Sequence, residues 1–212
     1  QEKIDELQEF KDSIKQYKYR FVEESDEGNA NLFFHFQCVL NSLISNLSFW
    51  ILIKMADYRG AWNKLIDAQE YLEFGMRIDG EFYGVVEFYN HLKKMEGLIF
   101  PDWPIYMSIG LIATGGKCSI CNREYNTCDH LDGYVYMGTL CQRIERKIIR
   151  MDHCAVVENP YDRRCIVDWI STDDGKKRDY VTLKISDEEI EDKNGGRTMS
   201  AVVYHLDHLD LD

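Results

Sequence analysis

The segment Lys117–Lys147, KCSICNREYNTCDHLDGYVYMGTLCQRIERK, contains four of the chain's seven cysteines. Cys118 and Cys121 are separated by two residues, and Cys128 and His130 follow closely. Two cysteines at this spacing can turn both sulfurs inward across one tight loop, and Cys and His are the usual side chains around tetrahedral zinc. The segment therefore predicts a Zn²⁺ site that organises the second half of the chain.

Five side chains in this segment compete for the four positions of a tetrahedral site: Cys118, Cys121, Cys128, His130 and Cys141. Cys128 and His130 are one residue apart, so in an extended segment their side chains point the same way. One ligand set is Cys118, Cys121, Cys128 and His130, and another replaces Cys128 or His130 with Cys141. The Cys118–Cys121 pair belongs to every set. Four protein ligands close the site, which predicts a structural ion; buried free cysteines are the simpler alternative.

The first hundred residues predict a helical bundle. Apolar residues recur at helical spacing in four segments, and short connections between helices favour antiparallel neighbours. Leu7, Ile14 and Phe21 also follow heptad spacing, so a coiled coil is the alternative for the first helix. The expected helices are 2–24, 31–57, 60–76 and 81–96.

The remainder of the chain predicts short strands around the cysteine-rich segment. Pro101 and Pro104 end the helical pattern, and a connector with one strand leads to Lys117. We expect a helix from Cys141 over CQRIERKIIR, whereas the tail from Met199 fits strand or helix equally. The strands expected from β-branched runs are 154–158, 165–170 and 180–185, with a short helix at 187–193. The fold class is therefore α+β, a helical bundle over 1–100 followed by a small zinc-stabilised β-rich module over 101–212.

The segment Phe33–Ile53 is free of Asp, Glu, Lys and Arg and is long enough to span a bilayer. It nevertheless contains many polar side chains, including His35, Gln37 and Asn41, which are costly in hydrocarbon. We therefore interpret it as a buried helix of a soluble domain, and we expect no membrane partner.

The charge balance is strongly acidic, with 25 basic and 37 acidic residues giving a formal net charge of −12. Such a surface disfavours non-specific binding of nucleic acid, whose affinity comes from Lys and Arg on phosphates. A basic run is the local exception: Arg143, Arg146, Lys147 and Arg150. These residues are candidates for nucleic-acid binding, but a solvated face or a contact with the acidic segment 187–192 is the simpler interpretation.

The odd cysteine count, the Cys-x-x-Cys spacing and the missing secretory signal predict a reducing, cytoplasmic location. Cys38 lies inside an expected helix and is interpreted as a packing residue. Cys154 and Cys165 flank expected strands and are interpreted as core residues or a loose pair.

The tail offers a second polar group, His205 and His208 with Asp207 and Asp210. These side chains could bind a metal, but their spacing is more typical of an exposed polar edge of the protein. We therefore expect no second metal site there.

The pattern C-x2-C-x6-C-x-H-x2-G-x2-Y-x-G-x2-C from Cys118 to Cys141, followed by HCAVVENPYDRRC, resembles a zinc-knuckle segment of phage-derived and bacterial proteins, some of them prohead-protease or capsid-associated proteins. The resemblance covers residues 118–165 and implies a phage-linked or mobile-element setting without implying an activity. The matching residues are Cys118, Cys121, Cys128, His130, Gly133, Tyr136, Gly138, Cys141 and the stretch 157–160.

Asp129-His130 after a Cys-x-x-Cys also resembles the ββα-metal (HNH-type) nucleases, which implies that His130 activates water beside a divalent metal. The loop between Cys121 and His130 is short for that motif. The Asn and the second His of the following helix are also missing, since Gln142 and His153 are poor substitutes.

The sequence therefore predicts a non-catalytic, zinc-stabilised interaction subunit of a larger cytosolic assembly, in a phage-linked or bacterial antiviral-defence setting. A protein partner or a homo-oligomer is expected. Two alternatives stay open: a divergent HNH-like metal-dependent nuclease, and a regulatory sensor subunit that recognises a protein or nucleic-acid ligand.

Overall fold

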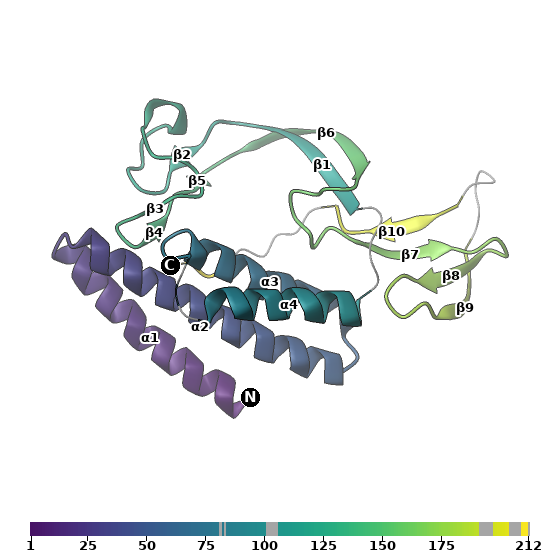
Figure 1. Ribbon diagram of the computed structural model, residues 1–212. Coiled ribbons are helices and arrows are strands. Elements are labelled where there is room, and N and C mark those ends of the chain that lie inside the picture. The colour runs from purple at the N-terminus through teal and green to yellow at the C-terminus, as the bar shows by residue number, and fades with distance from the viewer. Residues whose placement is uncertain (81, 83, 101–105, 191–196, 204–208, 212) are drawn as a thin grey trace. The chain divides into compact units, whose positions relative to one another are not determined.

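The computed structural model describes all residues except 81, 83, 101–105, 191–196, 204–208 and 212 (Figure 1). The chain divides into two compact units. The first unit consists of Gln1–Glu96, Ala113–Ile149 and His208–Asp212, and the second of Gly97–Ile112 and Arg150–Asp207. The predicted α+β class, with helices in the N-terminal half followed by a strand-rich region, is confirmed.

The four helices predicted for the first hundred residues are present, with shifts at their ends. Asp26 and Asp57 start two of them, because their carboxylates accept hydrogen bonds from Asn29 N (3.1 Å) and Gly60 N (2.8 Å). The last helix starts later than predicted, directly after Gly84, whose φ of 81° lies in the left-handed region. The helices are α1 (Glu2–Glu23), α2 (Glu27–Lys54), α3 (Tyr58–Met76) and α4 (Val85–Ile99).

Helix α2 is the central helix of the first unit and packs against both α1 and α3. By length and composition it could cross a membrane, a test that the core helix of a soluble protein also passes. Two of its polar side chains bond within the unit: Ser42 Oγ donates to Ala68 O (2.7 Å), and Asn41 Nδ2 donates to Asp210 O (2.7 Å). Cys38 is fully buried on the same helix, as predicted for a packing residue.

The cysteine-rich segment folds as a small module of two-residue strands in antiparallel pairs. Strand β2 (Lys117–Cys118) pairs with β5 (Arg143–Ile144), and β3 (Val135–Tyr136) pairs with β4 (Thr139–Leu140). A 3-10 turn, η1 (Tyr125–Thr127), lies between β2 and β3.

The module packs directly onto the helices. Leu140 is buried in one cluster with Phe34 of α2 and Tyr71 of α3. At the turn between β3 and β4, Gly138 N donates to Asn31 Oδ1 (2.7 Å), and a Cβ at Gly138 would lie 2.9 Å from Ala30 O. The structure therefore groups the module with the helices, which differs from the division at residue 100 expected from the sequence. The reason is this shared apolar cluster.

The prediction of a helix from Cys141 over CQRIERKIIR is wrong. The chain there forms β5 and then β6 (Ile148–Val157). Glu145 has a φ of 54°, which ends any helical path, and Lys147 O accepts a hydrogen bond from Thr114 N (3.0 Å). The β-branched isoleucines of this segment suit a strand.

The second unit contains a two-stranded ribbon and a four-stranded antiparallel sheet. Strand β1 (Tyr106–Ala113), predicted from its apolar sequence, pairs with β6. The sheet has the order β10 (Met199–Ala201), β7 (Val167–Ser171), β8 (Lys176–Asp179), β9 (Ile185–Glu189). Buried Ile166 and Val167 belong to its core.

Two further sequence predictions fail in the sheet of the second unit. The strand expected at 180–185 is largely the turn between β8 and β9, because Asp179 Oδ1 accepts from Val181 N (3.1 Å) and Thr182 N (2.6 Å). A helix was expected at 187–193, but residues 187–189 belong to strand β9. Residues 191–193 of that expected helix lie outside the described residues. The strands expected at 154–158 and 165–170 overlap β6 and β7.

We predict that Leu140→Ala lowers the free energy of unfolding by about 2–5 kcal/mol, because it leaves a cavity in the cluster that joins the module to the helices. Leu131→Ala, in the same module but at a side chain that is 55% exposed, is the matched control and should change stability little. Urea unfolding measures both. Equal effects of the two substitutions would show that the module does not share its core with the helices.

Candidate metal centre

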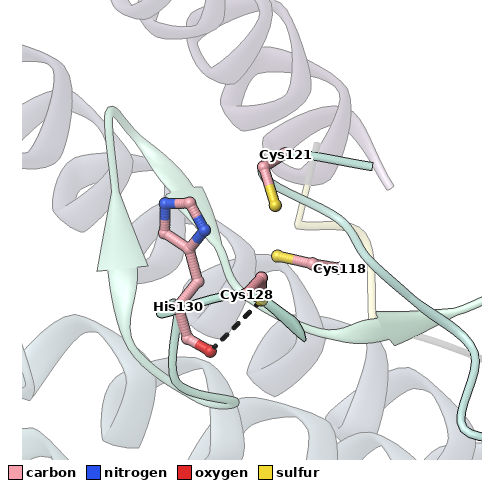
Figure 2. A group of neighbouring side chains, drawn as sticks. All are labelled: Cys118, Cys121, Cys128 and His130. Carbon is pink, nitrogen blue, oxygen red and sulfur yellow. Dashed lines mark hydrogen bonds between the residues drawn. The ribbon is translucent and has the colours of Figure 1, made fainter. Parts of the chain in front are cut away.

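Four potential ligands converge within the module. The ligand atoms of Cys118, Cys121, Cys128 and His130 all lie within 4.8 Å of one another. Figure 2 shows the three thiols and the imidazole gathered around a common space. The sulfurs of a tetrahedral site with metal–sulfur bonds of about 2.3 Å lie about 3.8 Å apart, so a small contraction would bring these atoms to a single ion. The cluster could therefore hold a metal ion.

The first pair of ligands stands on a tight turn. Cys118 ends β2, and its carbonyl accepts a hydrogen bond from Asn122 N (2.9 Å). Asn122 has a φ of 57°, a left-handed conformation that asparagine tolerates, which supports its expected role in the turn. Cys118 N in turn donates to Arg123 O (2.9 Å). These two hydrogen bonds close the turn, and the sulfurs of Cys118 and Cys121 both lie in the ligand cluster.

The second pair stands on extended chain after η1. Cys128 has φ −114° and ψ 158°, so Cys128 and His130 project to the same side, as predicted. The His130 ring packs edge-on against Tyr136, with centroids 4.7 Å apart. Tyr136 OH also accepts from Leu131 N (3.1 Å). The tyrosine therefore fixes both the ring and the backbone of the loop that presents it.

His130 Nδ1 is buried, and among the described residues it has no hydrogen-bond partner. A buried polar atom of this kind is costly unless something binds it. Its position in a cluster of three thiols is what a metal-binding nitrogen requires. The residues present therefore fit a metal ion.

Cys141 stands next to the cluster, outside the group of four. Its sulfur lies 3.8 Å from Cys118 Sγ, and the side chain is fully buried. Its backbone is fixed by two hydrogen bonds, from Cys141 N to Tyr134 O (2.7 Å) and from Gly133 N to Cys141 O (2.8 Å). Burial raises the pKa of Cys141 to about 12, so its thiol keeps the proton and can donate it toward Cys118.

The pKa of the Cys121 thiol is lowered, in contrast to that of Cys141. A hydrogen bond from the Arg123 backbone, reinforced by the Arg123 side chain, lowers the pKa of Cys121 to about 6. Cys121 is therefore a thiolate at neutral pH, which is the form that binds a metal. Burial acts in the other direction on Cys128 and raises its pKa. Arg123 was not among the site residues predicted from the sequence, although its place beside the Cys-x-x-Cys turn is a usable signal.

The four basic candidates do not lie on a helix face, since they stand on β5, on β6 and between them. Arg143 stacks on the Tyr125 ring at 4.1 Å and lies 3.9 Å from Asp132. Arg150 pairs with Asp152 at 3.2 Å. Arg146 and Lys147 are exposed. Two of the four cations are therefore already engaged with anionic or aromatic neighbours.

The remaining candidates lie elsewhere. His205, Asp207 and His208 are outside the described residues, and Asp210 pairs with buried Lys11 at 2.7 Å. Cys154 is exposed and Cys165 is buried. Within the described part of the chain, Cys118, Cys121, Cys128 and His130 form the one group with metal-binding geometry.

Comparison of the chain with protein-family models, with curated proteins and with solved structures finds no match.

We predict that Cys121 of the metal-free protein reacts with iodoacetamide as a thiol of pKa about 6. Its thiolate is favoured in the fold, so its reactivity should persist as the pH falls and drop only around that pH. Exposed Cys154 is the internal control. Mass spectrometry of the alkylated peptides gives both pH profiles. Coincident profiles would contradict the role assigned to Arg123.

Proposed function

We propose that residues 113–149 form a zinc-stapled, non-catalytic module that fixes a protein-binding surface within a larger cytosolic assembly. The observation that carries this proposal is the convergence of Cys118, Cys121, Cys128 and His130 in a segment with little core of its own. Three thiols and one imidazole form a donor set that suits zinc better than harder cations such as magnesium or calcium.

A structural role follows from the number of ligands. Four protein ligands complete a tetrahedron, whereas catalytic zinc keeps one position open for water or substrate. The strands of the module are only two residues long, and isolated pairs of this kind are not stable in water. A bound ion would supply the missing folding free energy, as it does in other small zinc modules.

The metal cluster is linked to the helices through the β3–β4 hairpin, which follows His130 in the chain. Met137 N donates to Glu27 Oε1 (3.3 Å), Gly138 N binds Asn31, and Leu140 enters the helical core. The Arg77 guanidinium at the end of α3 donates to Gly133 O. An ion that orders residues 118–130 would therefore also fix how the hairpin sits on α2 and α3.

The nuclease alternative has less support from the geometry. An HNH-type site needs a helix after the histidine to complete its metal site, and this chain has β5 and β6 there. His130 is also part of the thiol cluster, where it would be a ligand and would not activate water. The phage-linked or antiviral-defence setting rests on the resemblance of residues 118–165 to zinc-knuckle segments, and it is proposed on that ground.

We predict about one zinc per chain in the purified protein, lost in His130→Ala and Cys121→Ser together with the fold of the module, because a structural site needs all four ligands. Cys154→Ser, at an exposed free thiol, is the control and should retain both zinc and stability. Elemental analysis and thermal unfolding with and without chelator provide the measurements.

The same proteins are assayed for DNA cleavage. Absence of zinc from the purified wild-type protein would contradict the proposed structural zinc site. Cleavage by the wild type that disappears in a well-folded His130→Ala variant would establish the nuclease instead.

A further inference from the structure

Strand β6 is unusually apolar for a surface strand. Ile148, Ile149, Met151 and Val156 are each more than half exposed. Among the described residues β6 pairs only with β1, so its other edge has no neighbouring strand there. A two-stranded ribbon is marginal in water, and a long apolar edge is a template for another strand.

The charges on β6 are self-complementary. Arg150 and Asp152 are two residues apart, so their side chains project from the same face of the strand, and they pair at 3.2 Å. If two β6 strands ran antiparallel about an axis through Met151, Arg150 of each copy would lie opposite Asp152 of the other. The same register places Met151 against Met151, Ile149 against His153 and Ile148 against Cys154, which would cover the exposed side chains of Ile148, Ile149 and Met151.

We propose that β6 pairs antiparallel with β6 of a second copy of this chain, about a two-fold axis at Met151. The two ribbons then form one four-stranded sheet in the order β1-β6-β6-β1. Such an interface is closed, because the same strand serves both copies, and two-fold dimers are the commonest oligomers. The residues of this interface lie on β6, outside the metal cluster, so we expect the dimer to form independently of metal content.

A nucleic acid is the less favoured occupant of this strand. Between residues 143 and 152, Glu145 and Asp152 offset two of the four cations, and Arg143 is stacked on Tyr125. Nucleic-acid binding depends on contacts between cations and phosphates, so it would leave the exposed apolar side chains of Ile148, Ile149 and Met151 without a binding partner. A strand of the same sequence satisfies both the apolar and the charged side chains.

The test uses two single charge reversals. Arg150→Asp places like charges opposite each other in a homodimer, and so does Asp152→Arg. Each should weaken self-association about tenfold or more, measured by light scattering and analytical ultracentrifugation of the full chain. An equimolar mixture of the two should restore a dimer, because residue 150 of one copy then again faces an opposite charge at residue 152 of the other. Circular dichroism shows whether each variant is folded.

A cross-link tests the register. In a Cys154→Ser background, Met151→Cys should form an interchain disulfide under mild oxidation, since the axis passes through this residue. Tyr161→Cys, at a fully exposed position of the same unit, is the control and should cross-link little.

A monomeric wild type at high concentration would overturn the proposal, and so would a dimer that both single reversals leave unchanged. Equal cross-linking at positions 151 and 161 would overturn the register. A monomeric chain that binds DNA or RNA, and loses this binding in Arg150→Asp, would assign the strand to nucleic acid instead. Zinc content measured in each sample separates these outcomes from a failure of the metal proposal.

Discussion

Three thiols and an imidazole, with ligand atoms that all lie within 4.8 Å of one another, are the constraint around which residues 113–149 are arranged. Bringing these groups together requires a left-handed turn at Asn122, an extended chain at Cys128 and a tyrosine against the His130 ring. The same groups repel or remain unsatisfied without an ion, as the buried Nδ1 of His130 illustrates. The loop geometry and the proposed zinc are therefore two parts of one arrangement.

The module also acts on the helices. Its β3–β4 hairpin contributes Leu140 to the cluster of Phe34, Cys38 and Tyr71, and its backbone amides bind Glu27 and Asn31 at the start of α2. These contacts couple the module to the start of α2 and to one apolar cluster of the helices. This coupling fits a scaffold whose binding surfaces must stay fixed better than it fits a site that opens for chemistry.

The sequence predicted the helices because their apolar spacing is a local property, and it predicted the candidate ligands because Cys-x-x-Cys spacing reflects a local turn. It did not predict the strands at 141–150. There the outcome depends on Glu145 adopting a positive φ and on Lys147 pairing with distant Thr114, which no local pattern encodes. The separation of Cys141 from the group of four likewise depends on the fold of the β3–β4 hairpin. The grouping of the module with the helices also depends on tertiary contacts, such as those of Leu140 with Phe34 and Tyr71.

Hydrogen exchange with and without zinc tests the central claim most directly. The amides of Gly133 and Cys141 close the module through their bonds to Cys141 O and Tyr134 O. If a bound zinc ion stabilises the module, chelation should remove the protection of these amides against hydrogen exchange, while the amides of central α2 and α3 should keep their protection. Unchanged protection of Gly133 and Cys141 after verified loss of the metal would contradict the account.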